Sequence, residues 1–131
     1  MYNYTNKSLK ITVSPQYQDE LSSPLENYYV WSYNIFIENY GIETVQLLSG
    51  YWRIIDSDGN IQEIIGEGVF GRQPLIHPSE YFEYTSHTTL KTSSGIMLGC
   101  YNIIIPSIKE TFDIIIPAFS LDNPYEKMSI N

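Results

Sequence analysis

The chain has 131 residues, of which 43% are hydrophobic and 15% aromatic, and this composition excludes a generally disordered protein. Fifteen acidic and seven scattered basic residues give a net charge of -8, so we expect binding neither to nucleic acid nor to membranes. Cys100 is the only cysteine, and no apolar run approaches the roughly 20 residues of a membrane helix. We therefore expect one cytoplasmic domain without disulfides.

Alternating apolar residues predict the first strands. Leu9, Ile11 and Val13 alternate with polar residues and predict a half-buried strand, which Pro15 weakens or ends. Residues 29–37 carry aromatic or branched apolar side chains at alternate positions. This is the cleanest period-two pattern in the chain, and it predicts a central strand.

The middle of the chain is less regular. Residues 45–55 are apolar on both parities, as in a strand covered on both faces or one that crosses a bulge near Gly50. Residues 56–60 contain Asp-Gly and predict a tight hairpin turn into a short strand over residues 61–65. Residues 66–79 hold three glycines and two prolines and predict a long loop.

Three further strands follow, and they complete the expected fold class. The predicted strands cover residues 81–90, 96–105 and 112–116, the last ending at Pro117. About seven short strands and no helical period predict an all-β fold, an antiparallel two-sheet β-sandwich. We expect a single domain over residues 1–131 with its core at about 8–121, loose N-terminal residues 1–6 and a loose tail after 121.

Gly66, Gly68 and Gly71 spell G-x-G-x-x-G, the string that binds dinucleotides when a strand precedes it and a helix opens at its third glycine. Residues 72–78 contain two prolines and cannot form that helix. Two interpretations remain. The backbone N–H groups could hold a diphosphate with Arg72 as the cation, or the glycines serve a tight loop between the sheets.

Asp56, Asp58, Asn60 and Glu67 follow the spacing of a calcium-binding EF-hand loop. The sharp turn of that loop requires glycine at the position that Ile61 occupies, and the flanking helices are missing. The predicted hairpin turn explains the same residues, so we expect no metal there.

His77, His87 and Cys100 match no compact metal-ligand spacing. Cys100 lies in an apolar segment, where a free cysteine usually packs as a small hydrophobic residue, and it has no cationic neighbour in sequence to activate it. No serine lies in a G-x-S-x-G segment. We expect no catalytic residues, no metal ligands and no cofactor.

Five segments resemble, in order, the motifs of the ApaG family, and together they span roughly residues 9–121. They are QLLSGYW (46–52), GEGVFGRQPL (66–75), YTS (84–86), GIMLGCY (95–101) and IPAFSL (116–121). Two positions depart from the family pattern. Gly50 stands where the family usually has arginine, and His87 where it usually has glycine.

The resemblance implies a fibronectin type III or immunoglobulin-like β-sandwich. It implies a stand-alone bacterial protein whose domain recurs in eukaryotic F-box and polymerase-interacting proteins as a protein-interaction module. It also implies an association with cobalt and magnesium efflux phenotypes.

We therefore expect a non-enzymatic cytoplasmic binding module that engages a protein partner of unknown identity. The alternative is a small-ligand module that binds diphosphate or a nucleotide at Gly66, Gly68, Gly71 and Arg72. A third hypothesis is a divalent-metal sensor, motivated by the efflux association and the turn at Asp56. Edge strands of an open sandwich can also pair between chains, which allows a homodimer.

Overall fold

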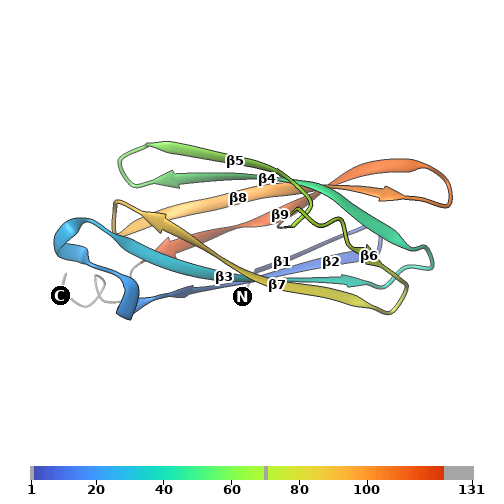
Figure 1. The fold of residues 1–131 in the computed structure, drawn as a ribbon, viewed down its shortest axis with the longest axis horizontal. Coiled ribbons are helices and arrows are strands. Elements are labelled where there is room, and N and C mark those ends of the chain that lie inside the picture. The colour runs from blue at the N-terminus through green and yellow to red at the C-terminus, as the bar shows by residue number, and fades with distance from the viewer. Residues whose placement is uncertain (1, 70, 123–131) are drawn as a thin grey trace.

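The computed structural model describes residues 2–69 and 71–122, and within them nine strands form two antiparallel sheets, one above the other (Figure 1). The expected all-β sandwich is confirmed, with nine strands rather than about seven. The first sheet has the order β1 (Tyr2–Asn6), β2 (Leu9–Tyr17), β3 (Tyr29–Asn39), β7 (Tyr81–Leu90). The second has the order β5 (Ile61–Glu67), β4 (Val45–Asp56), β8 (Ser94–Ile105), β9 (Glu110–Asp122), with β6 (Leu75–Ile76) also on β4. Short 3-10 turns η1 (Asp19–Leu21) and η2 (Pro24–Glu26) lie between β2 and β3.

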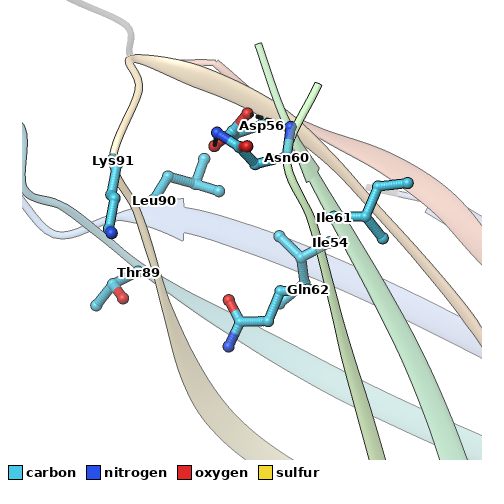
Figure 2. A pocket seen from close by; sticks show the side chains of 8 residues that line it. All are labelled: Ile54, Asp56, Asn60, Ile61, Gln62, Thr89, Leu90 and Lys91. Carbon is cyan, nitrogen blue, oxygen red and sulfur yellow. Dashed lines mark hydrogen bonds between the residues drawn. The ribbon is translucent and has the colours of Figure 1, made fainter. Parts of the chain in front are cut away.

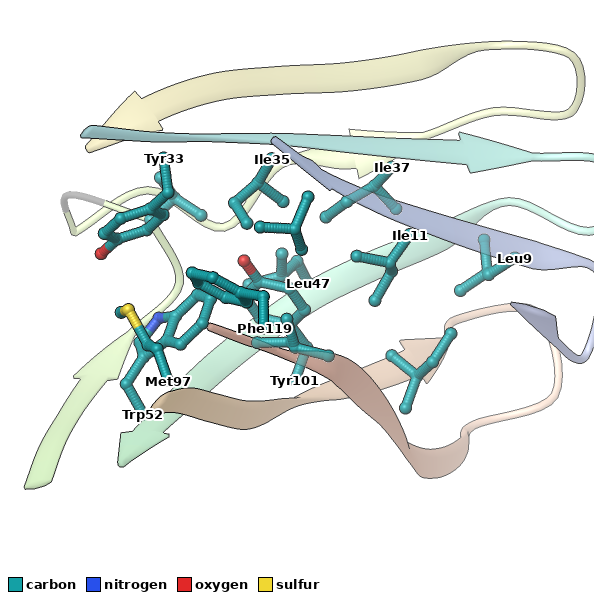
Figure 3. Packing of buried hydrophobic residues seen from close by; sticks show 14 of the residues in the cluster. Leu9, Ile11, Tyr33, Ile35, Ile37, Leu47, Trp52, Met97, Tyr101 and Phe119 are labelled. Carbon is teal, nitrogen blue, oxygen red and sulfur yellow. The ribbon is translucent and has the colours of Figure 1, made fainter. Parts of the chain in front are cut away.

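The core fills the space between the two sheets (Figure 3). The alternate residues of β3 point into it as predicted, and Trp31, Tyr33 and Ile35 are buried. Trp52 of the second sheet lies near the centre, with its ring centroid 5.3 Å from that of Tyr33. A large side chain buried among aromatic neighbours stabilises the core through ring–ring contacts in addition to the burial of its apolar area.

Residues 2–6 are paired as a strand, where the sequence predicts loose N-terminal residues. Tyr2–Asn6 forms β1, which pairs with β2 through a tight turn whose two residues, Lys7 and Ser8, have φ angles of 48° and 66°. A two-residue hairpin turn usually places glycine or asparagine at such positions, so the sequence gives no turn signal here. The predicted tail lies outside the described residues from 123 onward.

Two strands continue past prolines that the pattern treats as ends. β2 runs through Pro15 to Tyr17, because β1 pairs with β2 only as far as Val13 and the rest of β2 lies at the sheet edge, where proline is tolerated. β9 is an edge strand and runs through Pro117. This proline lies opposite a register shift between Met97 and Gly99 of β8. Bulges and edges accommodate a residue without an N–H group.

The irregular apolar segment is β4, and it crosses a bulge, as one of the two interpretations had it. The register against β8 shifts between Leu47 and Ser49, just before Gly50. The hairpin turn after β4 is confirmed: the Asp56 carboxylate accepts the backbone N–H groups of Asp58 and Asn60, each at 2.9 Å.

The sandwich is closed on one side and open on the other. β1 and β2 pack against β9 on the closed side. On the open side, the edge strands β5 and β7 face each other across two hollows.

Candidate functional site

A pocket of about 360 Å³ opens beside the glycine string, on the open side of the sandwich. Its walls combine residues of β3, β4, β5 and β7 with the loop after β5. The lining residues are Tyr33, Gly50, Trp52, Ile64, Gly66, Glu67, Gly68, Val69, Gly71, Tyr84, Ser86 and His87. We call it the glycine-loop pocket.

The glycine string forms a tight loop that is hydrogen-bonded to β4. Gly68 N–H donates to the Leu48 carbonyl at 2.8 Å, and Val69 and Arg72 exchange backbone hydrogen bonds of 2.8 and 2.9 Å. Gly68 has φ of +61°, and a Cβ there would lie 1.7 Å from the Arg72 carbonyl oxygen. Gly71 also has positive φ, +77°, but with open space around it. The loop therefore requires glycine at position 68 for its own backbone.

The structure brings the predicted diphosphate residues together in part. Gly66, Gly68 and Gly71 line the glycine-loop pocket, whereas Arg72 is not among the described residues that do. The N–H groups of Gly68, Val69 and Arg72 donate within the chain. A bound anion would have to use other donors.

Tyr33 and Tyr84 form the polar floor of the pocket. The hydroxyl groups of Tyr84 and Tyr101 are hydrogen-bonded to each other, and Tyr33 bonds to Ser86. Burial raises the pKa of Tyr33, Tyr84 and Tyr101, so all three are neutral near neutral pH. The floor can exchange hydrogen bonds but provides no charge. Gly50 lies beside it, and a Cβ there would lie 3.3 Å from the Tyr101 ring, so the missing side chain leaves room for that ring.

Both positions that depart from the family pattern, Gly50 and His87, line this one pocket. Nothing in the sequence alone could place them together, because they lie on strands of different sheets. His87 brings an imidazole, whose ring nitrogens can form hydrogen bonds, to the pocket wall.

A second hollow of about 340 Å³ lies toward the β4–β5 turn, where Asp56, Asn60 and Gln62 face Thr89 and Lys91 (Figure 2). The Asp56 carboxylate already accepts hydrogen bonds from Asp58 and Asn60 within the turn. Burial by itself raises the pKa of Asp56, but the hydrogen bonds from the backbone and side chain of Asn60 and from the backbone of Asp58 lower it overall.

The residues weighed as metal ligands stay apart. Within residues 2–69 and 71–122, no group of three histidine, cysteine, aspartate or glutamate side chains could hold a metal ion. His77 accepts or donates a hydrogen bond of 3.0 Å with Thr44, while Cys100 lies half-buried on β8. Burial and the nearby Asp113 carboxylate raise the pKa of the Cys100 thiol.

The side of the second sheet that faces away from the core carries a large apolar surface, which we call the outer face. The register places Ile61 of β5 beside Ile55 of β4, and Ile55 in turn beside Ile96 of β8. In the sequence, this face was signalled by the apolar residues of β4 at positions that alternate with its core-facing residues. The apolar outer-face residues are Tyr51, Ile55, Ile61, Ile65, Ile96, Leu98, Cys100, Ile104 and Ile115.

The ApaG domain model matches residues 19–104 of the chain. The chain belongs to the ApaG family. Proteins named ApaG from Rhodospirillum centenum and Paramagnetospirillum magneticum are 46% and 48% identical to it over 131 residues, covering 100% of each chain.

Solved structures agree with the ApaG assignment. The crystal structure of a protein designated ApaA from Bordetella pertussis is similar with a TM-score of 0.85 and 39% identity, covering 88% of this chain and 94% of that one. A protein from Archaeoglobus fulgidus shares the fold alone, with a TM-score of 0.53 and 7% identity over 85% of this chain and 94% of that one. No helix in the described part of this ApaG domain has the length and apolarity needed to cross a membrane.

Proposed function

We propose that this ApaG domain is a non-enzymatic cytoplasmic binding module that engages a protein partner. The outer face of the second sheet carries this proposal. Its isoleucines are strongly exposed for apolar side chains: Ile65 is 79% exposed, Ile61 and Ile115 are each 55% exposed, and Ile96 is 48% exposed.

An apolar surface that spans four strands supports a protein partner better than a small ligand. Single exposed hydrophobic residues are common, but a contiguous set marks a surface that another protein covers. Polar groups such as Arg53 and Glu63 lie among these residues on β4 and β5, and they would give a partner its register. The association with cobalt and magnesium resistance would then act through that partner.

Affinity capture with matched variants tests the proposal. Ile96→Asp together with Ile115→Asp places charge on the outer face and should abolish capture of a partner that the wild-type domain retains. Ile108→Asp is the control, because Ile108 is 55% exposed, like Ile115, but lies in the turn between β8 and β9. Retention of the same partner by the outer-face double variant, or its equal loss with the control, would remove the outer face as its binding surface.

The glycine-loop pocket supports a second candidate, in which a diphosphate or nucleotide binds at Gly66, Gly68, Gly71 and Arg72. The pocket has the size of a small-ligand site. Thermal shift with diphosphate, ATP, cobalt and magnesium tests it, since a ligand that binds only the folded state raises the midpoint. A rise with diphosphate that Arg72→Ala leaves unchanged would exclude Arg72 from the site. A rise with cobalt or magnesium alone would favour the metal-sensor hypothesis.

A further inference from the structure

We propose that β5 accepts an extended segment of the partner protein as an added strand, with lysine or arginine opposite Glu63 and Glu67 and apolar side chains between them. This inference rests on the proposed protein-binding function and names the kind of segment bound. Its three supports are the free edge of β5, the charge on that edge and the glycine-loop pocket beneath it.

The edge of β5 is free, and the charges of Glu63 and Glu67 are the one common edge-protecting feature that it carries. Among the described strands β5 pairs with β4 alone, the pairing shows no register shift, and all seven of its residues are exposed. It has no lysine, proline or bulge, whereas the edge strand β9 has Pro117 and a register shift opposite it. A free edge presents a row of backbone groups on which another strand can add.

The charge of this edge selects against a second copy of the chain. Glu63 and Glu67 project on the outer side of the strand, and the Tyr51 hydroxyl donates to the Glu63 carboxylate at 2.5 Å. Antiparallel pairing of two β5 strands about Ile65 would place Glu63 of each strand directly opposite Glu67 of the other, without a cation from either strand. Like charges across a pair of strands are destabilising, while lysine or arginine opposite each glutamate is favourable. The complementary occupant is a basic strand of another protein.

The inner side of β5 gives the added strand an anchor. Ile64 and Gly66 line the glycine-loop pocket together with Val69 and Tyr84. Gly66 has open space where a Cβ would lie. Residues directly opposite in antiparallel strands share a face, so the added residue opposite Gly66 points toward the pocket. A phenylalanine there would cover the glycine and fill the space.

These positions define the sequence of the segment. Read from its N-terminus, the added strand places a basic residue opposite Glu67, an aromatic residue opposite Gly66, apolar residues opposite Ile65 and Ile64, and a basic residue opposite Glu63. The core sequence Lys-Phe-Val-Val-Lys satisfies this order, and Glu-Phe-Val-Val-Glu is its charge-reversed match.

Fluorescence anisotropy with the two fluorescein-labelled peptides, each flanked by glycines, tests the charge requirement. The wild-type domain should bind the lysine peptide about tenfold more tightly than the glutamate peptide. The double variant Glu63→Lys with Glu67→Lys should reverse this preference. The control Glu20→Lys with Glu26→Lys changes the net charge equally at exposed positions between β2 and β3, and it should keep the wild-type preference.

NMR amide shifts then locate the peptide, and the expected result is that they change at residues 61–67 and around the glycine loop. Absence of binding, a preference that the control reverses equally, or shifts confined to β7 or to the outer face of β8 and β9 would overturn the strand-addition proposal. A cellular partner lost with Ile96→Asp and Ile115→Asp but retained by the Glu63 and Glu67 variant would overturn it while leaving the protein-binding function in place. A partner retained by both variants would remove both surfaces.

Discussion

Alanine at each glycine of the G-x-G-x-x-G string should separate backbone geometry from ligand binding. The three positions differ sharply in their surroundings. Gly68 combines a φ of +61° with a Cβ position 1.7 Å from the Arg72 carbonyl oxygen, Gly71 has a φ of +77° and open space, and Gly66 has open space without a positive φ.

The magnitudes follow from these surroundings. Gly71→Ala should cost about 1–2 kcal/mol, the penalty of an L-residue in the left-handed region. Gly68→Ala adds to this roughly 1–3 kcal/mol for relieving the overlap. It also loses the hydrogen bonds between Val69 and Arg72, at about 1 kcal/mol each. The total for Gly68→Ala is then about 4–7 kcal/mol. Gly66→Ala should be neutral or stabilise the fold by up to about 1 kcal/mol, since alanine restricts the unfolded chain.

Urea unfolding followed by tryptophan fluorescence measures all three, with an unchanged slope as evidence of a common unfolded state. The expected order of stability is Gly66→Ala, then Gly71→Ala, then Gly68→Ala. Equal losses for Gly68→Ala and Gly71→Ala would refute the assignment of this loop to backbone geometry. Equal stability of all three variants with a shared loss of diphosphate binding would favour the small-ligand alternative.

Three further predictions concern the core and its polar groups. Above about pH 10 the free energy of unfolding should fall by up to about 1.4 kcal/mol per pH unit for each of Tyr84 and Tyr101, because the unfolded tyrosines release protons that the folded ones keep. This contribution is complete below pH 10, and urea unfolding with no loss of stability above it would contradict the burial of the pair. Asn39→Ala should cost about 2–4 kcal/mol, since the buried amide donates to two backbone carbonyls at 2.8 and 2.9 Å; a urea midpoint close to wild type would count against this role. Ile35→Ala should cost about 2–5 kcal/mol and Ile42→Ala less than about 0.5 kcal/mol, because Ile35 is fully buried and Ile42 is 92% exposed; similar losses in calorimetry would be inconsistent with the described core.

The sequence predicts strands whose one face is buried and misses strands held by distant partners. β3 alternates because its inner residues enter the core. β1 has no such alternation, and its place is fixed by pairing with β2 and by the Tyr2 ring 5.9 Å from that of Phe119. Pro15 and Pro117 mislead for a related reason, since proline is tolerated there because of a neighbouring strand: β1 ends before Pro15, and the register with β8 shifts opposite Pro117.

The candidate sites were predictable only in fragments. The glycine loop shows directly in the sequence, but the pocket beside it joins Gly50 and His87 from different sheets, and no local pattern contains that pairing. The second apolar parity of β4 signals the outer face without showing whether another layer covers it. The free edge of β5 follows from the sheet order. β4 lies between β5 and β8, so β5 has a neighbour on one side only, and the local sequence does not show this order.

The pairing of β3 with β7 and of β4 with β8 has a kinetic consequence. Tyr29 lies opposite Leu90 and Gln46 opposite Ile104, so neither sheet can close until more than half of the chain is available. Chains dominated by such distant pairings fold in milliseconds to seconds, whereas a local hairpin forms in about 1–10 µs. The β4–β5 hairpin should therefore form while β8 and β7 are still unplaced. During refolding its isoleucines face solvent on both sides, and dilution or an early-binding partner strand should raise the yield.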